Sequence, residues 1–312
     1  MEKRKRQHYK QFDAARTFMF NEYPAEYTKT IGVPGHFVKL SNRKVLLNNG
    51  IEGMMDSAFV LDPDGEILTE RVAACLEHQS TPVDEEKLEK MGDYDIQLVS
   101  DENLPTLIIV ASHLSSRKSK IIFRRSPSDV TILYFLDLGE KDNRRRLTRL
   151  SKLIENNQHL TIEDALNLGV ILLYAPRERA CEITEKVVNL YLDIHDDLDH
   201  EMEKCLYSVF SVLIDAFFDD ENEYRRLTKM IDEKTSQESQ MRFASQERTI
   251  QSLTYAEENL AHTKEDLANA KEDLTHTKED LANAKEDLAN ANDKILRLEA
   301  EVKRLTEKLD GK

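Results

Sequence analysis

Residues 55–61 read MDSAFVL, residues 71–79 read RVAACLEHQ, and the turn sequence DPDG separates them at residues 62–65. Both runs are apolar enough to form buried strands. Pro63 and Gly65 favour a reversal of the chain, because proline presets φ for a turn and glycine accepts a positive φ. This stretch therefore predicts a β-hairpin.

The sequence around the hairpin predicts a mixed α/β architecture. Upstream, we expect a helix over 7–22, with the chain broken from Pro24 onward. Downstream, apolar residues at helical spacing predict a helix over 84–98. Apolar, β-branched runs predict further strands over 106–111, 120–123 and 130–136. Alternation of strands and helices is typical of a mixed sheet core flanked by helices, and the residues after 147 have helical spacing.

The C-terminal part of the chain is a heptad repeat. With Leu253 at position a, nine successive a positions up to Leu309 are apolar, whereas the d positions hold Ala or Thr until Leu298. Unbroken apolar a positions are typical of a coiled coil. Asp266 at g and Lys271 at e attract each other between chains in a parallel pair, and this pattern repeats. The tail therefore predicts a parallel coiled-coil homodimer.

Composition agrees with a division of the chain into parts. Of its 312 residues, 40% are hydrophobic and 33% are charged, which is too charged for one compact domain and too apolar for full disorder. We expect an α/β core over 1–157, a helical extension over 158–243 and the coiled coil over 244–312.

The cysteines and the apolar runs indicate the compartment. Cys75, Cys181 and Cys205 are odd in number and contain no close pair, which argues against a disulfide framework and a cysteine zinc site. The basic first residues are not followed by the apolar segment of a signal peptide. No apolar run approaches the length of a membrane span. We expect a cytoplasmic protein that does not bind membranes.

The distribution of charge suggests where a nucleic acid could bind. The chain carries a net charge of −15, but between residues 117 and 152 eleven Lys and Arg stand against four Asp and Glu. Local clustering of this kind suits phosphate contact whatever the total charge, although an ordinary solvated surface helix would give the same pattern. The candidate DNA-contacting residues are Lys118, Lys120, Arg124, Arg125, Arg144, Arg145 and Arg146.

Glu77 and Gln79 end the second strand of the hairpin. Because side chains alternate along a strand, both point to the same face. A carboxylate at the end of an apolar strand is unfavourable when buried, unless a polar partner or a metal ion compensates it. A satisfied polar pair and a metal site are the two alternatives.

A metal site needs a second acid on the neighbouring strand, and there are two candidates. Asp64 lies in the turn, at the opposite end of the hairpin from Glu77. Asp56 lies nearly opposite Glu77, and paired residues on adjacent strands are about 5 Å apart, close enough to hold Mg²⁺ between their carboxylates. We therefore choose Asp56 as the partner and assign Asp64 a role in the turn.

These features together resemble a known family. An acid that opens a strand is followed by an Asp-Gly turn, a Glu-His-Gln-Ser run after an apolar strand, and a helix with a tyrosine. In this chain the matching residues are Asp56, Asp64, Gly65, Glu77, His78, Gln79, Ser80 and Tyr94. They resemble the recombination-promoting nuclease and transposase-like family of the PD-(D/E)XK nuclease superfamily, over about residues 45–218. The repeat tail lies outside the resemblance.

The resemblance implies a restriction-endonuclease-like fold and DNA cleavage with Mg²⁺ or Mn²⁺, linked to recombination or mobile elements. It makes Asp56, Glu77 and Gln79 the catalytic residues. Asp56 and Glu77 would bind the metal, with His78 as a third ligand through its backbone carbonyl. Gln79 stands where the superfamily most often has lysine, and an amide can position a water but supplies no positive charge. Two residues could supply that charge instead: Lys118 and Lys120.

Two other functions fit the same residues. The chain could be a DNA-binding protein that keeps the nuclease fold without catalysis, or a scaffold whose folded part docks a protein partner. Metal-dependent nicking of a plasmid separates the nuclease from both. DNA retention that depends on salt, without cutting, would select the silent DNA-binding protein.

Overall fold

The computed structural model describes residues 2–47, 52–79, 81–112, 120–126, 129–218 and 220–310, and some side chains within these ranges, such as that of Arg125, are not described. The chain divides into two compact units, Met1–Ser245 and Gln246–Lys312. In the part of the chain that the structure describes, no helix is long and apolar enough to cross a membrane.

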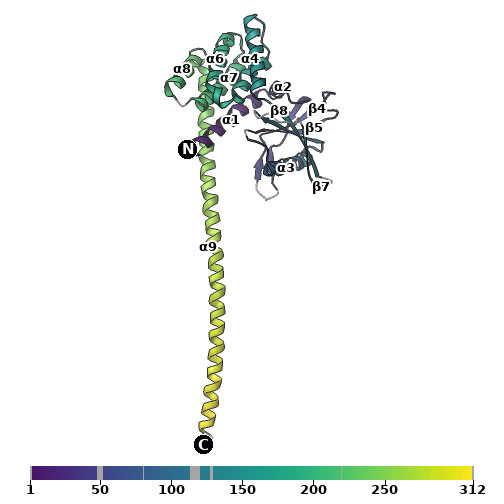
Figure 1. The fold of residues 1–312 in the computed structure, drawn as a ribbon. Helices are drawn as coiled ribbons and strands as arrows, with labels where there is room; N and C mark the ends of the chain where they lie inside the picture. The colour runs from purple at the N-terminus through teal and green to yellow at the C-terminus, as the bar shows by residue number, and fades with distance from the viewer. Residues whose placement is uncertain are drawn as a thin grey trace. The chain divides into compact units, whose positions relative to one another are not determined.

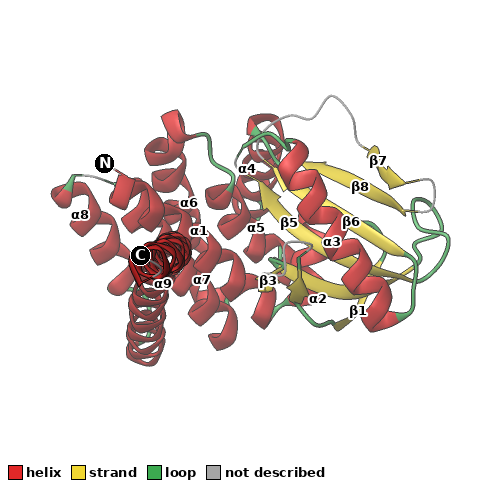
Figure 2. Cartoon of the chain, turned by 90° about the horizontal axis from the view of Figure 1, so that it is seen from below, coloured by secondary structure: helices red, strands yellow, loops and turns green. Residues whose placement is uncertain are grey.

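The first unit contains a six-stranded mixed sheet in the order β1-β4-β5-β6-β8-β7 (Figures 1 and 2). The central strands β5, β6 and β8 are parallel to one another, and β1, β4 and β7 are antiparallel to their neighbours. A mixed sheet flanked by helices, expected from the sequence, is confirmed. The strands are β1 (His36–Leu40), β4 (Ser57–Asp62), β5 (Val72–Gln79), β6 (Thr106–Ser112), β7 (Lys120–Ser126) and β8 (Asp129–Asp137), while β2 (Lys44–Leu46) and β3 (Glu52–Met54) form a separate two-stranded sheet.

Helices surround this sheet and continue the chain after it. The helices of the first unit are α1 (Glu2–Glu22), α2 (Pro24–Ile31), α3 (Glu85–Glu102), α4 (Glu140–Glu155), α5 (Ile162–Leu173), α6 (Ala180–Ile194), α7 (His200–Phe217) and α8 (Glu221–Asp232). The last helix, α9 (Gln237–Asp310), begins in the first unit and forms the second. Helices α1 and α2 come from the N-terminal region but pack with α7 and α5 respectively, so the helical part of the first unit draws on both ends of its sequence.

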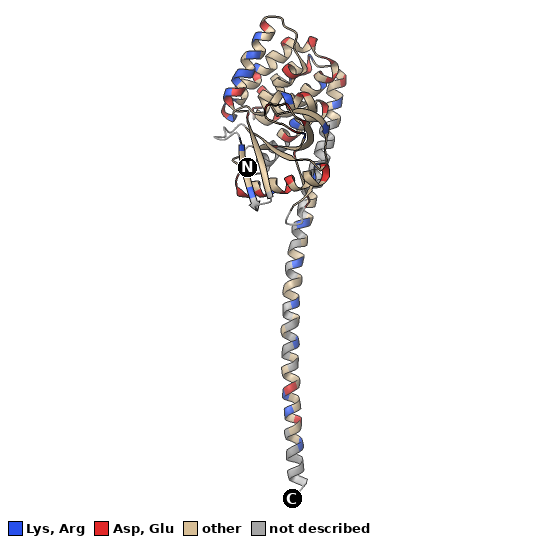
Figure 3. Ribbon diagram, turned by 90° about the vertical axis from the view of Figure 1, so that its right-hand side faces the viewer, with Lys and Arg blue, Asp and Glu red and all other residues tan. Residues whose placement is uncertain are grey.

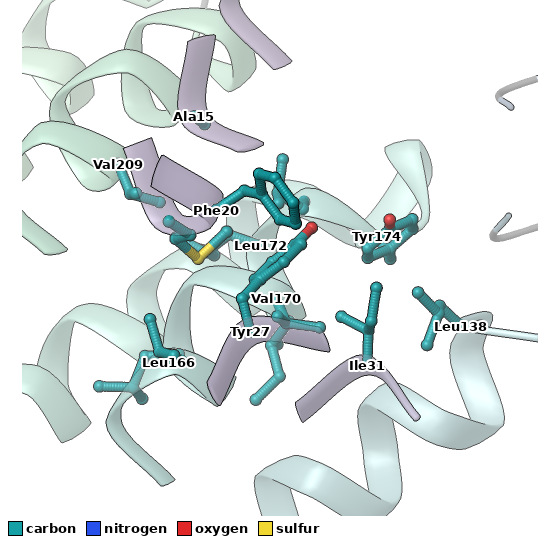
Figure 4. Close-up of a cluster of buried hydrophobic side chains, with 14 of the residues drawn as sticks. Ala15, Phe20, Tyr27, Ile31, Leu138, Leu166, Val170, Leu172, Tyr174 and Val209 are labelled. Atoms are coloured by element: carbon teal, nitrogen blue, oxygen red, sulfur yellow. The ribbon is translucent and has the colours of Figure 1, made fainter. Parts of the chain in front are cut away.

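The two faces of the sheet bury different hydrophobic clusters. On one face Met91, Tyr94 and Leu98 of α3 pack with Cys75 of β5 and other strand residues. On the other face the alternate residues of β5, such as Leu76, pack with a larger cluster from α1, α2, α5 and α7 (Figure 4). Since side chains alternate along a strand, Glu77 and Gln79 continue the α3 face and His78 continues the opposite one.

Helix α2 differs from the sequence prediction, in which the chain is broken from Pro24 onward. The structure places Pro24 in the first turn of α2, where its missing N–H is not needed and its fixed φ suits the helix. The helix ends at Gly32, which has a φ of +82°. Tyr27 and Ile31 are buried in the larger cluster, so tertiary packing stabilises a helix too short to be stable alone.

The turn of the hairpin is organised by Asp64. Its carboxylate accepts the backbone N–H groups of Glu66, Ile67 and Leu68 at 3.0, 2.9 and 2.9 Å, and that of Gly35 at 3.0 Å. These donors hold the pKa of Asp64 well below its usual range. The role in the turn expected for Asp64 is confirmed.

Two glycines near this turn should respond differently to the same substitution. Both have positive φ, but a Cβ on Gly35 would lie 2.5 Å from the carbonyl oxygen of Asp62, whereas a Cβ on Gly32 meets nothing within 4 Å. Gly32→Ala should therefore lower the free energy of unfolding by only about 1–2 kcal/mol, the cost of a side chain on a residue with positive φ. Gly35→Ala should lower the free energy of unfolding by roughly 3 kcal/mol or more, because the backbone at Asp62 or at residue 35 must move to make room for the Cβ. Urea unfolding of both variants measures the difference, and equal losses would contradict this geometry.

Candidate functional site

Asp56 and Glu77 face each other across the hairpin. Ser57 pairs with Leu76 in the antiparallel register, so the next position outward sets Asp56 opposite Glu77. The backbone N–H of Asp56 donates to Glu77 Oε1 at 2.9 Å, and the backbone N–H of His78 donates to Asp56 Oδ2 at 2.9 Å. Each carboxylate thus accepts a backbone hydrogen bond from the other strand segment, and together they close the end of the hairpin.

The two carboxylates share the face of the sheet that α3 covers. Ala58 and Cys75, one alternation inward from Asp56 and Glu77, both belong to the α3-side cluster. Gln79 follows on the same face and is half-buried. The structure therefore brings together all three predicted catalytic residues, Asp56, Glu77 and Gln79, at one corner of the sheet.

Neighbouring contacts hold both strand ends in place. The N–H of Met55 donates to the carbonyl of Arg43 at 2.9 Å, and Arg43 Nε donates to the carbonyl of Met55 at 3.0 Å. On the other strand, Ser112 Oγ donates to the carbonyl of Gln79 at 2.8 Å. The backbone beside each candidate residue is therefore fixed by a contact outside the hairpin.

Glu77 is in an unfavourable electrostatic environment. Its residue surface is only 4% exposed. Burial, followed by the neighbouring Asp56 carboxylate, raises the pKa of Glu77 to about 8, and the N–H of Asp56 and the ammonium of Lys90 only partly oppose this. A buried carboxylate beside a second carboxylate is the arrangement that a cation would relieve.

Among the described residues, Lys90 of α3 is a cation whose charge acts on this site. Its Nζ lies 5.3 Å from the centroid of the Tyr94 ring, and its charge lowers the pKa of both Glu77 and Cys75. Tyr94 is fully buried and donates to the carbonyl of Met54 at 3.3 Å. Sequence reasoning missed Lys90. The only available signal was its spacing of four residues from Tyr94, which places the two on one face of a helix.

The side chain of His78 points away from the carboxylates. It contacts the Tyr174 hydroxyl through Nδ1, and its ring packs against those of Tyr174 and Tyr27 at centroid distances of 6.0 and 6.5 Å. Burial, followed by the charge of Arg16, lowers the pKa of His78, so the imidazole is neutral. Its side chain cannot bind a metal held by Asp56, and only its backbone carbonyl is left for the expected ligand role.

The two carboxylates suit a hard divalent cation. Asp56 Oδ1 and Glu77 Oε2 have no hydrogen-bond partner among the described residues. Carboxylate oxygens are the ligands that Mg²⁺ and Mn²⁺ prefer, and Mg²⁺ is often held by two carboxylates plus water and substrate phosphate. The described residues contain no group of three or more His, Cys, Asp or Glu that could hold a metal ion. The donor set is therefore a pair.

The predicted DNA-contacting residues are distributed over two elements. Lys120 and Arg124 are exposed on the edge strand β7, while Lys118 and the side chain of Arg125 lie outside the described residues. Arg144 and Arg145 are exposed on α4 and pair with Glu140 and Asp142 of the same helix, at 2.9 and 2.5 Å.

Arg146 has a different environment from its two neighbours. Its side chain is only 11% exposed, and its guanidinium contacts Asp142 and the Asn167 side chain and donates to the carbonyl of Thr30 at 2.7 Å. It joins α4 to α2 and α5. A guanidinium with three internal acceptors is not available to a phosphate, so we exclude Arg146 from the DNA-contacting surface.

The raised pKa of Glu77 predicts how stability depends on pH without metal. Between its ordinary value of 4.5 and about 8, the unfolded chain has released this proton while the folded chain keeps it. The free energy of unfolding should therefore fall as pH rises through this range, by about 1.4 kcal/mol per unit at most, and level off above it. Urea unfolding with EDTA from pH 5 to 9 measures the slope.

Two variants serve as the test and its control. Glu77→Gln should remove this contribution to the slope. Glu102→Gln should leave it in place and reduce stability at neutral pH, because Lys39 and Ser41 lower the pKa of Glu102. A slope unchanged by Glu77→Gln would contradict the proposed environment.

No protein-family model, no curated protein and no solved structure matches this chain.

Proposed function

We propose that this protein is a metal-dependent nuclease that hydrolyses DNA phosphodiester bonds at Asp56 and Glu77. The observation that carries the proposal is the pairing of two carboxylates across the hairpin, one of them buried with a raised pKa. Perturbed carboxylates of this kind concentrate at functional sites. The restriction-endonuclease-like character of the sheet and the choice of Mg²⁺ or Mn²⁺ are parts of the same proposal.

The roles of the residues follow from their positions. Asp56 and Glu77 would hold the cation, which supplies a Lewis acid for the phosphate and lowers the pKa of a water molecule. Gln79, on the same face, can orient a water through its amide. Lys90 supplies the positive charge that Gln79 lacks, and its ammonium would balance charge that develops on the phosphate. The backbone contacts of both acids keep them in place before substrate binds.

The second candidate is a DNA-binding protein without catalysis. It is favoured by one observation, that Gln79 stands on the strand where a lysine would be expected. The charge of Lys90 opposes it, since this charge acts on Glu77 from α3 and lowers its pKa. The two candidates differ in whether bound DNA is cut.

Plasmid nicking with Mg²⁺ or Mn²⁺ tests the proposed chemistry. Asp56→Asn and Glu77→Gln should both abolish cutting, because each removes a ligand charge. Glu77→Gln should not reduce stability in the absence of metal, since the neutral amide needs no proton to be buried. Lys90→Ala should lower the rate roughly 100-fold, and Lys90→Arg should lose less, if the positive charge acts on the reacting phosphate.

The matched control is the acid at the other end of the hairpin. Asp64→Asn should leave cutting nearly intact at a temperature where the variant is folded. Equal loss from Asp64→Asn and Glu77→Gln would mean that the wrong acid has been assigned. DNA binding by the wild-type protein without any cutting would select the second candidate.

We further propose that α9 assembles two chains into a parallel coiled coil. In the single chain, the a positions of the tail are exposed to solvent over seven consecutive heptads. They are Leu260, Leu267, Leu274, Leu281, Leu288, Ile295 and Val302, with exposed fractions of 52–62%. A stripe of aliphatic residues at a spacing of seven is the seam that a second helix covers.

A disulfide at one position distinguishes the two directions of the pair. Leu298 is 61% exposed and occupies a d position near the C-terminal end. Leu298→Cys should form a disulfide with its own copy readily in a parallel pair, because equal positions face each other. In an antiparallel pair the two cysteines would be far apart. Non-reducing gels after mild oxidation measure the cross-link.

The native cysteines allow a clean experiment. Cys181 is exposed and should be replaced by serine, whereas Cys75 and Cys205 are buried. Lys303→Cys gives a matched position that faces away from the seam, since it follows the a position Val302. A monomer in light scattering, or equal cross-linking at 298 and 303, would contradict the parallel dimer.

A further inference from the structure

A groove between α4 and α6 carries cations on both of its walls. Its volume is about 430 Å³. Arg144 contributes from α4, while Arg179 and Lys186 contribute from the other side, and Asn143, Thr148 and Asn189 add polar groups. Arg179 and Lys186 are far from Arg144 in sequence and were not recognised as DNA-contacting residues. The fold therefore assembles a positive groove that no single stretch of sequence contains.

The three cations of the groove outnumber the carboxylates that pair with them. Glu140 pairs with both Arg144 and Arg179, at 2.9 and 2.7 Å. Glu182 pairs with both Arg179 and Lys186, at 3.1 and 2.6 Å. Three cations thus stand against two carboxylates, and the carboxylates are themselves about half exposed. Exposed pairs of this kind contribute little to stability, so their carboxylates can be replaced by other anions.

The groove is continuous with the exposed face of α4. A second hollow, of about 580 Å³, is lined by Lys141, Arg145, Arg149 and Lys152. Arg144 and Thr148 line both hollows, and Lys and Arg follow one another along this helix (Figure 3). From residue 141 to residue 152 a helix rises about 16 Å, which corresponds to roughly five phosphates of one DNA strand.

The groove and the exposed face of α4 begin near the carboxyl ends of the central strands, which is also the end of the sheet where the acid pair lies. Strands β5, β6 and β8 are parallel, and Gln79, Ser112 and Asp137 are in register at their carboxyl ends. Helix α4 starts three residues after Asp137, at Glu140. The wall residue Asn143 donates to the carbonyl of Tyr174 at 2.8 Å, and the Tyr174 hydroxyl contacts His78. The groove and the acid pair therefore lie at the same end of the sheet, the acid pair on the α3 face and the groove on the side of the helices that His78 faces.

We propose that the groove between α4 and α6 binds the phosphate backbone of DNA, with Arg144, Arg179 and Lys186 as its contacts. This inference rests on the proposed function, because a nuclease needs a surface that binds its DNA substrate. Arginine and lysine side chains accompanied by amide and hydroxyl donors are the groups that proteins use for phosphate contacts. Glu140 and Glu182 hold the cations in position and compete with the phosphates for them.

Fluorescence anisotropy with a labelled DNA duplex of about 30 base pairs, in EDTA to prevent cutting, tests the proposal. The double variant Arg179→Ala with Lys186→Ala should weaken binding roughly tenfold or more at moderate salt. It should also reduce the slope of log K against log salt by roughly two, one for each lost contact.

Helix α8 provides a matched control. Arg225 pairs with Glu221 at 2.9 Å, a distance within the range of the two Arg179 pairs, at 2.7 Å to Glu140 and 3.1 Å to Glu182. Lys229 pairs with Glu233 at 3.6 Å and Lys186 pairs with Glu182 at 2.6 Å, the two members of each pair being four residues apart. Arg225→Ala with Lys229→Ala removes the same charge and should change the affinity less than about twofold, because it lies outside the groove.

Removal of the competing carboxylates should change the DNA affinity in the opposite direction. Glu140→Gln with Glu182→Gln should tighten DNA binding several-fold, whereas a purely structural role for these ion pairs predicts weaker binding or none. The proposal is overturned if the groove variant binds like the wild type, if the α8 control loses as much, or if the carboxylate variant binds more weakly. It is also overturned if duplex RNA binds and DNA does not.

The outcome is separable from that of the nuclease proposal. If the groove results hold but the wild type does not cut, the groove inference stands and the assignment of Asp56 and Glu77 fails. If the wild type cuts, and the groove variant binds and cuts like it at limiting DNA concentration, the nuclease stands and the groove inference fails.

Discussion

The hydrogen bonds between Asp56 and the end of β5 set the geometry on which the rest of the site depends. Glu77 accepts the N–H of Asp56, and Asp56 accepts the N–H of His78. Each acid therefore fixes the backbone beside the other, and one oxygen of each has no partner among the described residues. The pair is preorganised, because the charges are held by backbone groups that cannot rotate away. The unfavourable burial of Glu77 is the consequence of this arrangement.

Because side chains alternate along β5, its carboxylate and amide groups lie on one face of the sheet and its imidazole lies on the other. Glu77 and Gln79 face α3, where Lys90 and Tyr94 lie, and His78 faces the helices that carry Tyr27 and Tyr174. On the second face burial keeps the imidazole of His78 neutral, and its ring packs against those of Tyr27 and Tyr174.

Lys and Arg side chains are clustered in one region of this protein, although its net charge is negative. The acidic chain concentrates Lys and Arg on α4, and the fold adds two further cations across the groove. Neighbours in sequence differ in role, since Arg145 is exposed and Arg146 joins α4 to α2 and α5. An internal guanidinium with three acceptors stabilises the fold, whereas an exposed one paired with a shared carboxylate stays available to an anion.

The sequence by itself determined the hairpin, the mixed sheet, the choice of Asp56 over Asp64 as the acid opposite Glu77, and the heptad pattern of the tail. These follow from alternation, turn chemistry and spacing, which are local properties of the chain. Only the tertiary structure decided that α2 forms from Pro24 onward, that the charge of Lys90 acts on Glu77, and that Arg146 is internal. Only it brought Arg179 and Lys186 opposite Arg144. Each of these depends on contacts between segments distant in sequence, and local patterns carry no information about which segments meet.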